Sequence, residues 1–412
     1  MSAFFLLKSY LSRNITTGTL TIVDAKGKPH QFGDGTGDPL TVEITKPSLY
    51  WRLALFPDPT AGEAFMEGTL KLLEGTIFDL FAILGSQPGS KPSLKWNKFN
   101  SWRWRQWRPN PISKARQNVA HHYDLSRRLF ELFLDEDLQY SCAYYQRDED
   151  SLEQAQLNKK QHIAAKLALQ PGMKVLDIGS GFGGMAIYLA ETCGVEVVGV
   201  TLSEEQYKLS CRKCQERGLQ DRVTFKLLDY RKLDEKFDRI VSVGMFEHVG
   251  VNHYSEYFSK VKGLLTDDGV ALIHTIGRLY GPCETSRWIT KYIFPGGQIP
   301  AFSQVAPICE RQQLLITDYE ILGLHYARTL LEWRNRFMAN RKRAQLMYDE
   351  RFCRMWEFYL ASSEASFRFH DLVIFQIQLT KQLATLPITR DYMLNQEKSR
   401  AGHYPKIRRA RS

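Results

Sequence analysis

The stretch "VLDIGSGFGG" at residues 175–184 decides the fold. A short apolar strand runs into a turn with glycines at Gly179, Gly181 and Gly183, and a helical stretch begins near Met185. Glycines let a ligand approach the backbone, and the first amides of a helix are available to bind it. On this motif alone, a turn that merely packs a helix on a strand is the alternative. The stretch therefore predicts a strand, a ligand-binding turn and a helix, in that order.

Similar apolar runs recur along the chain and alternate with helical stretches. Five of them lie at residues 174–179, 195–202, 222–228, 237–244 and 269–277. Short continuous runs of β-branched residues are typical of a parallel sheet that is covered on both faces. Two later runs, at 319–325 and 371–381, are suited to close the sheet with an antiparallel edge. We therefore predict an α/β fold with a doubly wound, Rossmann-like sheet.

Three details favour S-adenosylmethionine over NAD as the ligand of the glycine turn. Asp177 precedes the first glycine, where its carboxylate would hold the cationic amino group of the methionine. The run "TLSEEQ" at 201–206 offers polar groups for the ribose hydroxyls, much as an acid does in dinucleotide-binding folds. The run "LLDY" at 227–230 offers an acid and an aromatic ring for the adenine. The predicted domain is therefore of the class I methyltransferase type.

The basic residues are concentrated in two segments. The chain has a formal net charge of +10, while residues 91–117 alone carry +8 and residues 398–412 carry +6, so the remainder is slightly acidic. The first segment contains "SWRWRQWRPNP" at 101–111. Such a run can stack on nucleic acid bases, insert into a membrane interface or pack between domains. The lack of a recognisable RNA-binding module counts against the first reading, and the other two stay open.

A chain of 412 residues is expected to form two domains. We place a small α+β domain, which contacts lipid or supports a dimer, at 1–90, the basic tryptophan-rich linker at 91–120, the methyltransferase domain at 121–385 and a basic tail at 386–412. We expect the tail to be mobile beyond about Thr389. No run of apolar residues reaches the length needed to span a bilayer, and we see no signal peptide. The seven scattered cysteines indicate a reduced, cytoplasmic setting, and the lone pair Cys211 and Cys214 lacks the second ligand pair of a zinc site, so we predict no metal.

A family resemblance rests on longer motifs. The stretch "HHYDLSRRLFELFLDEDLQYSCAYYQ" at 121–146, together with the glycine turn, "VVGVTLSEEQ", "DYRKLDEKFDRIVSVGMFEHVG", "LIHTIG" and "WITKYIFPGG", resembles the cyclopropane-fatty-acyl-phospholipid synthase family, which is S-adenosylmethionine-dependent and related to the mycolic acid cyclopropane synthases. The likeness runs in order over about residues 115–383. The N-terminal "LALFPDPTAGEAFMEGTL" is similar to the smaller domain of the bacterial members that act on phospholipid. The resemblance thus implies membrane phospholipid as the substrate.

The same resemblance implies a reaction and a set of residues. The methyl group of S-adenosylmethionine is transferred to a cis double bond of an acyl chain, and the resulting carbocation closes to a cyclopropane ring as a bound bicarbonate takes its proton. The bicarbonate ligands carried across by motif are Cys142, Glu247, His274, Tyr326 and, through its backbone, Ile276. The cofactor-binding residues are Tyr140, Ser141, Gly179, Gly181, Gly183, Thr201, Leu202, Gln206, Tyr230 and Arg231, beside Asp177 and Asp229.

The chemistry of these residue types agrees with such a reaction. Aromatic rings can face a carbocation, and the candidates are Tyr140, Tyr144, Tyr145 and Phe246. An ionised Glu247 would repel bicarbonate, so we expect it either to share a proton with the anion or to orient His274 or Tyr326. His248 either supports the site or caps the local turn. The turn departs from the family pattern at Ser180 and Phe182, where the family usually has Cys and Trp, and neither change puts cofactor binding in doubt.

Several alternatives remain beside cyclopropane synthesis. A related fatty-acyl C-methyltransferase, which leaves a methyl or methylene branch, shares the same carbocation and is not separated by sequence. A nucleic-acid-binding protein with a methyltransferase-like fold, or a noncatalytic scaffold, fits the site residues less well. As partners we predict membrane phospholipid and the membrane surface, no nucleic acid, and a possible homodimer. The predicted location is the cytoplasm, peripherally on the inner face of the membrane.

Overall fold

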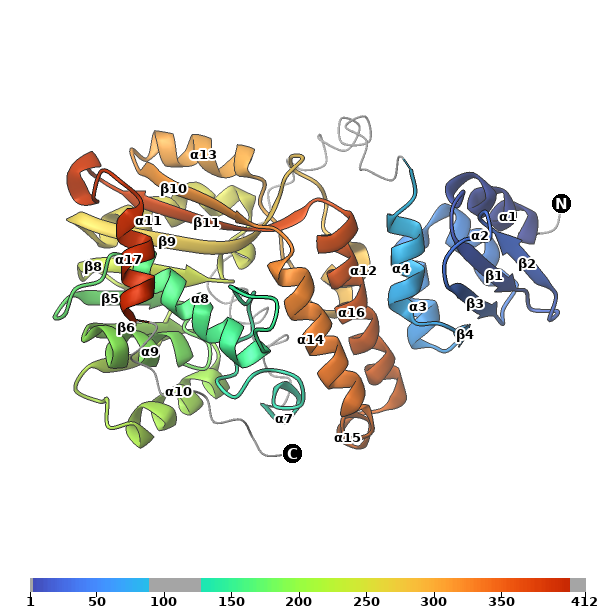
Figure 1. Ribbon diagram of the computed structural model, residues 1–412, viewed down its shortest axis with the longest axis horizontal. Helices are drawn as coiled ribbons and strands as arrows, with labels where there is room; N and C mark the ends of the chain where they lie inside the picture. Colours follow the sequence, from blue (N-terminus) through green and yellow to red (C-terminus); the bar gives the residue numbers. More distant parts are fainter. Residues whose placement is uncertain (1–2, 89–126, 401–412) are drawn as a thin grey trace. The chain divides into compact units, whose positions relative to one another are not determined.

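The computed structural model describes residues 3–88 and 127–400 (Figure 1). They form two compact units. Among the described residues, the first unit comprises residues 3–88, 284–295 and 330–371, and the second comprises residues 127–283, 296–329 and 372–400. The tryptophan-rich linker predicted at 91–120 lies outside the described residues, and so does the end of the basic tail from residue 401. The three readings of the linker therefore stay predictions.

A seven-stranded sheet forms the centre of the second unit. Its strands are β5 (Lys174–Ile178), β6 (Glu196–Thr201), β7 (Val223–Leu227), β8 (Phe237–Val243), β9 (Leu265–Arg278), β10 (Leu315–Leu322) and β11 (Leu372–Thr380). They lie in the order β10-β11-β9-β8-β5-β6-β7. Strands β5 to β9 run parallel, and β11 is antiparallel to both of its neighbours. The predicted doubly wound α/β fold with an antiparallel edge is confirmed.

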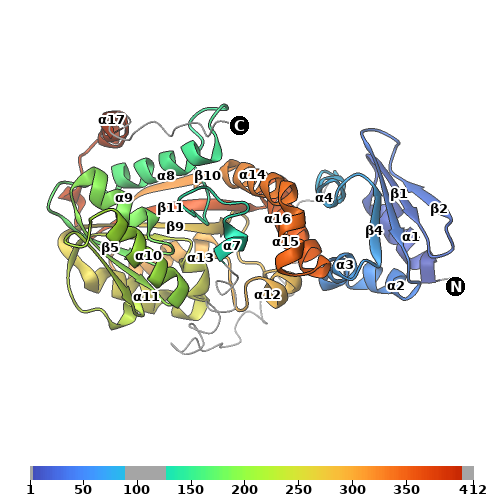
Figure 2. The same cartoon turned by 90° about the horizontal axis from the view of Figure 1, so that it is seen from below.

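Helices cover both faces of this sheet (Figure 2). One face carries α8 (Leu152–Lys166), α9 (Gly184–Cys193) and α10 (Glu204–Glu216), and the other carries α11 (Tyr254–Leu264) and α13 (Phe302–Arg311). Val175 and Val241 pack with residues of α8, α9 and α10, whereas their sequence neighbours Leu176 and Ile240 pack with residues of α11 and α13. Both faces of each strand are thus buried, and this explains why the strands read as continuous apolar runs.

The first unit contains a four-stranded sheet of order β2-β1-β3-β4. Its strands are β1 (Thr19–Val23), β2 (Pro29–Phe32), β3 (Pro39–Ile44) and β4 (Leu70–Glu74). Its helices are α1 (Ala3–Asn14), α2 (Ser48–Leu55), α3 (Pro57–Met66), α4 (Ile77–Gly85), α12 (Arg287–Tyr292), α15 (Arg341–Met347) and α16 (Glu350–Phe369). The predicted small α+β region at the N-terminus is therefore present. Helix α14 (His325–Ala339) begins in the second unit and continues into the first.

Two late segments of the chain complete the first unit, which differs from the boundaries drawn by sequence. Trp288 of α12 is buried, and its ring lies so close to Gly62 of α3 that an added Cβ there would come within 2.4 Å of it. The ring of Phe358 on α16 contacts Trp288 at 4.6 Å and Phe81 of α4 at 5.1 Å between centroids. Periodicity shows that a helix has an apolar face but not which distant element covers it. For that reason the boundaries predicted from the sequence include these helices in the methyltransferase domain, whereas in the structure they belong to the first unit.

The chain beyond Thr389 was expected to be mobile, and over part of its length this expectation is wrong. Residues Asp391–Arg400 form α17, which packs against α8 and is seen beside it in both views (Figures 1 and 2). Arg390 pairs with the buried Asp318 at 2.5 Å, and Met393 is buried. The residues that hold this helix in place are distant in the sequence, so the composition of the tail does not predict them.

Within the described ranges, none of the helices combines the length and the apolar character needed to cross a bilayer. The longest of them, α16, has 20 residues and includes several charged side chains.

Candidate active site

The predicted site residues gather at the carboxyl edge of the parallel strands. Asp177 is the penultimate residue of β5, Thr201 ends β6, Asp229 follows β7, Glu247 follows β8, and His274 lies in the second half of β9. Parallel strands direct these ends to one edge of the sheet, where open α/β folds bind their ligands. The structure thus brings residues from five separate strands to one side of the second unit.

The glycines of the turn serve two different purposes. All three have positive φ angles, of 81° at Gly179, 53° at Gly181 and 84° at Gly183. A Cβ on Gly183 would lie 2.7 Å from Ser210 and 2.8 Å from Phe225, so this glycine allows α9 to pack closely. A Cβ on Gly181 would meet no described atom within 4 Å. Gly181 therefore leaves room beside the backbone, as a ligand-binding turn requires.

Asp177 is a buried carboxylate in need of a partner. The residue is 2% exposed, and within the described part of the chain its Oδ2 atom has no hydrogen-bond partner. Burial raises the pKa of Asp177 to about 7, against the opposing effect of the positive Lys159. A buried carboxylate without a partner costs free energy unless a cation or donor meets it. The amino group of S-adenosylmethionine fits this requirement, and the site therefore suits that cofactor.

The ends of β6 and β7 are held in place by local hydrogen bonds. Thr201 donates to Gln206 at 2.8 Å between Oγ1 and Oε1, and Leu202 between them is half-buried. Asp229 accepts two hydrogen bonds from the guanidinium of Arg231, at 2.9 and 2.7 Å. These pairs fix the loops at which the ribose and adenine are expected. Tyr230 lies half-buried between them, with its ring edge-on to Tyr257 at 5.6 Å between centroids.

A lysine that the sequence analysis did not single out lies under the loop of Tyr140 and Ser141. Lys159 of α8 is fully buried, and its Nζ donates to Ser141 Oγ and to Gln139 Oε1, each at 2.8 Å. Burial lowers the pKa of Lys159 to about 8. Its charge acts on both Asp177 and Cys142. A lysine in the polar run "LNKKQH" gives no signal of this role, because lysines in helices are usually exposed.

Glu247 has one carboxylate oxygen engaged and one unpartnered. It lies in the short turn η3 (Phe246–His248), where Oε1 accepts the Ile276 N–H at 2.6 Å. The other oxygen, Oε2, has no hydrogen-bond partner among the residues described. Burial raises the pKa of Glu247 to about 7. The amide of Ile276, which the resemblance implied as an anion ligand, therefore serves to orient Glu247 in this structure.

His274 presents an unpartnered ring nitrogen from the adjacent strand. It is 1% exposed, and its Nδ1 lies 3.1 Å from the amide nitrogen of Gln376 on β11. This amide orientation makes Nδ1 the acceptor and assigns the ring proton to Nε2, which lacks a partner in the described chain. Burial lowers the pKa of His274 well below its usual value. The residue is therefore a neutral imidazole with a donor to offer.

A hydrogen bond joins the segments that carry Cys142 and Tyr326. The Ala143 N–H donates to Thr329 Oγ1 at 3.1 Å, and Thr329 lies one turn after Tyr326 on α14. Cys142 is fully buried with its thiol 3.2 Å from the Ala143 carbonyl, and Tyr326 is 8% exposed. Burial raises the pKa of Cys142, so the thiol stays protonated and acts as a weak donor.

The structure sorts the aromatic candidates. Phe246 is 1% exposed, and its ring packs in the core against Tyr254 at 4.4 Å between centroids, which makes it a core residue. Tyr145 has the Arg328 guanidinium over its ring at 4.1 Å. Tyr144 stacks between two histidines. Tyr140 is half-buried, and its ring lies edge-on to Phe130 at 5.2 Å between centroids.

His248 follows Glu247 in the same turn. Burial lowers its pKa to about 4, so the ring is neutral at ordinary pH. The neutral ring adds no charge next to Glu247, and both predicted roles of His248 stay predictions.

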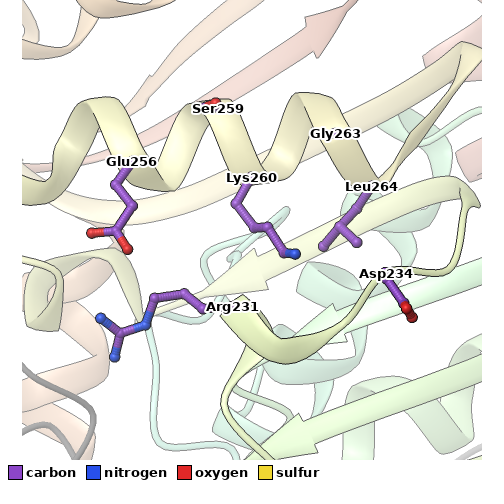
Figure 3. A pocket seen from close by; sticks show the side chains of 7 residues that line it. All are labelled: Arg231, Asp234, Glu256, Ser259, Lys260, Gly263 and Leu264. Carbon is purple, nitrogen blue, oxygen red and sulfur yellow. The ribbon is translucent and has the colours of Figure 1, made fainter.

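A surface pocket of about 420 Å³ lies between the loop after β7 and helix α11 (Figure 3). It is lined by Arg231, Asp234, Glu256, Ser259, Lys260, Gly263 and Leu264. Arg231 is the predicted site residue in this lining, and its guanidinium is already held by Asp229. Neither Asp177 nor the glycine turn lines this pocket.

Comparison with known proteins identifies related chains. A model of the family described as mycolic acid cyclopropane synthetase matches residues 111–377. The cyclopropane-fatty-acyl-phospholipid synthase of Escherichia coli strain K12 is 39% identical over 346 residues, which cover 83% of this chain and 88% of that one. Tuberculostearic acid methyltransferase UfaA1 of Mycobacterium tuberculosis is 38% identical over 339 residues, which cover 78% of each chain.

A solved structure extends this likeness to three dimensions. The mycolic acid cyclopropane synthase CmaA1, in a crystal structure complexed with SAH and CTAB, superposes with a TM-score of 0.62 at 34% identity. The superposition covers 66% of this chain and 99% of that chain.

Proposed function

Because the chain belongs to the mycolic acid cyclopropane synthetase family, we propose that it transfers a methylene group from S-adenosylmethionine to the cis double bond of an unsaturated acyl chain in a membrane phospholipid, forming a cyclopropane fatty acid. The observation that carries this proposal is that two buried polar atoms at the carboxyl edge of the sheet, Glu247 Oε2 and His274 Nε2, each have no hydrogen-bond partner among the described residues. S-adenosylmethionine supplies an activated methyl group, and a bicarbonate would take the proton whose loss from the carbocation closes the ring.

The cofactor is held by the strand ends. Asp177 meets the amino group with its free carboxylate oxygen, and Gly181 leaves space along the backbone. Thr201 and Gln206 hold the loop that faces the ribose, while Asp229 keeps Arg231 beside the adenine position. Gly179 and Gly183 shape the turn, Leu202 and Tyr230 flank it, and Tyr140 and Ser141 close it from the loop that Lys159 supports. These residues would hold S-adenosylmethionine in a single orientation, which is what transfer of its methyl group requires.

The proton-accepting part of the site is built from Cys142, Glu247, His274, Ile276 and Tyr326. Neutral His274 offers an N–H donor, while the protonated thiol of Cys142 donates to the Ala143 carbonyl and adds no negative charge to the site. Glu247 has a pKa near 7, so it can hold a proton between itself and an anion rather than repel that anion. The hydrogen bond from the Ile276 N–H to Oε1 of Glu247 fixes the direction in which the other oxygen, Oε2, points. The set therefore fits a small oxyanion such as bicarbonate.

A second candidate function is methyl or methylene branching of the acyl chain. It is favoured by the 38% identity to tuberculostearic acid methyltransferase UfaA1. Both reactions begin with the same attack of an alkene on a methyl group. They differ in the atom from which the proton leaves.

Labelled S-adenosylmethionine and vesicles of unsaturated phospholipid test the proposal directly. We expect the label in acyl chains that have gained a cyclopropane ring, identified by mass spectrometry after hydrolysis. Branched, ring-free chains would support the second candidate instead. Absence of label from every acyl chain, with cofactor binding retained, would reject lipid methylation altogether.

We also propose that the enzyme acts from the cytoplasm as a peripheral protein on the inner membrane face, and that it is able to form a homodimer. Exposed apolar side chains on two adjoining helices of the first unit support membrane contact. Phe5 and Leu6 on α1 are 55% and 46% exposed, and Trp51 and Leu55 on α2 are 44% and 59% exposed. The two helices contain three basic residues and no acidic one. Such a face suits the headgroup region of an anionic bilayer.

Replacing both Trp51 and Leu55 with alanine is expected to weaken binding to anionic vesicles by roughly tenfold, because two large apolar contacts are lost. Cosedimentation with vesicles of mixed phosphatidylglycerol and phosphatidylethanolamine measures the effect. Leu73→Ala is the matched control, since Leu73 is 57% exposed on β4, outside the two helices. Equal binding by the double variant and the wild type would remove this face from membrane contact.

A further inference from the structure

Helix α17 lies beyond the part of the chain that matches the family model, which ends at residue 377. It is nevertheless attached to the second unit by several polar contacts. Arg390 pairs with Asp318 of β10 at 2.5 Å, and the Tyr392 hydroxyl accepts a hydrogen bond from Gln378 of β11 at 2.7 Å. Glu397 contacts His162 of α8 at 2.5 Å between Oε1 and Nδ1. The helix is thus fixed at its start and along its length.

His162 is the centre of this attachment. Its Nδ1 faces Glu397, and its Nε2 lies 2.7 Å from Glu320 Oε2 on β10, so both ring nitrogens meet a carboxylate. Lys166, one turn further along α8, also pairs with Glu320 at 2.5 Å and with Asp318 at 3.3 Å. The His162 and Lys166 side chains are 7% and 1% exposed. A ring that donates from both nitrogens to two carboxylates must be protonated.

The ring of His162 also touches the active-site loop. Tyr144 stacks on it at 4.2 Å between centroids with the planes 9° apart, and the other side of Tyr144 stacks on His325 at 5.0 Å. His325 accepts the Tyr145 N–H on its Nδ1 at 3.1 Å. Cys142 precedes this pair of tyrosines by two residues, and Tyr326 follows His325 directly. The side chains of Glu397, His162, Tyr144 and His325 thus form a continuous column of contacts. This column reaches the proposed site at Tyr144, two residues after Cys142, and at His325, directly before Tyr326.

We propose that Glu397 and His162 are positioning residues, through which the C-terminal helix α17 holds the ring of Tyr144 and thereby sets the positions of Cys142 and Tyr326. They touch neither reactant. Their effect passes through the stacked rings and the backbone hydrogen bond of Tyr145. This inference rests on the proposed function for its activity readout, and on the geometry of the second unit alone for its structural one.

The charged groups of the column determine how the attachment of α17 depends on pH. Burial alone disfavours a charged His162, but its hydrogen bonds to Glu320 and Glu397 raise its pKa above the ordinary value. Burial likewise opposes ionisation of Glu320, but the hydrogen bond and charge of His162, together with Lys166, lower its pKa to about 2. The contribution of His162 is complete below about pH 6.5 and is lost as pH rises through its raised pKa. The contribution of Glu320 is complete above about pH 4.5 and is lost as pH falls through about 2. The attachment therefore loosens on the alkaline side.

The variant Glu397→Gln tests the proposal, with Asp391→Asn as the matched control on the same helix. Asp391 is exposed at the start of α17 and lies outside the column, while both changes remove one negative charge. For Glu397→Gln we expect kcat for lipid methylation to fall about five- to tenfold with the Kd for S-adenosylmethionine unchanged. The alkaline fall of kcat should move to lower pH, since the protonated ring has lost one of its carboxylates. Asp391→Asn should behave as the wild type.

Two structural measurements keep the test independent of the lipid assay. Hydrogen exchange should rise in residues 142–145 as well as in α17 of Glu397→Gln, and NMR titration should show a lowered His162 pKa. Faster exchange confined to α17, with kcat and its pH profile as in the wild type, would overturn the proposal. If the wild type does not methylate lipid at all, the proposed function fails, while exchange in residues 142–145 still decides the coupling.

Discussion

Replacing Glu247 with glutamine is expected to lower kcat for lipid methylation by about 100-fold or more, while the Kd for S-adenosylmethionine stays within about twofold. Glutamine keeps an oxygen that can accept the Ile276 N–H, so the turn after β8 retains its shape. It cannot share a proton with an anion, which is the property that a pKa near 7 gives to Glu247. The change thus removes a proton-transfer partner and preserves the local structure.

Stability measurements separate this effect from unfolding. The pKa of Glu247 in the folded protein is about 7, above the ordinary value of 4.5. Between pH 4.5 and 7 the folded protein therefore keeps a proton that the unfolded protein has lost, and the folded protein becomes less stable as pH rises through this range. The glutamine variant lacks this loss, and its melting temperature at pH 8 should equal or exceed that of the wild type. The matched control is Glu310→Gln, an exposed residue on α13, which should change neither quantity. Wild-type turnover in the Glu247 variant would exclude this carboxylate from the mechanism.

The architecture of the second unit could be read from the sequence because its signals are local. Each parallel strand is a short β-branched run buried on both faces, and the observed strands begin and end within a few residues of the predicted ones. The first unit could be predicted only in part. The helices around Trp288 and Phe358 are apolar on one side, but the elements that cover them lie more than 200 residues earlier in the chain. No local pattern contains that pairing.

The same distinction applies to the site. Asp177, Glu247 and His274 stand in motifs next to strand ends, so sequence places them at the correct edge of the sheet. The sequence does not predict the roles of Lys159, His162 and Glu397. All three are polar residues in polar helices, and their roles depend on partners that are distant in the sequence. Phe246 was misjudged for the opposite reason. Its motif is that of the site, but the turn η3 directs its ring into the core.

Asp177→Asn is expected to raise the Kd for S-adenosylmethionine by about 30- to 100-fold, the loss typical of a hydrogen bond to a charged group. Asparagine fills the same space, so the glycine turn and β5 keep their packing. It carries no charge for the amino group of the cofactor. Isothermal titration calorimetry of the lipid-free protein measures this Kd without any catalytic turnover.

The pH dependence of binding makes the prediction specific to a charged Asp177. In the wild type the carboxylate must ionise to meet a cation, so the Kd should fall by up to about tenfold for each unit by which the pH rises toward about 7, and should level off above it. The Kd of the asparagine variant should be flat over the same range. The variant should also be at least as stable as the wild type at pH 8, because a buried carboxylate with a raised pKa destabilises the folded protein once it is ionised. Asp221→Asn, at an exposed position before β7, is the control and should bind as the wild type does. A steep pH dependence that persists in the Asp177 variant would mean that another group, and not this carboxylate, holds the cofactor's amino group.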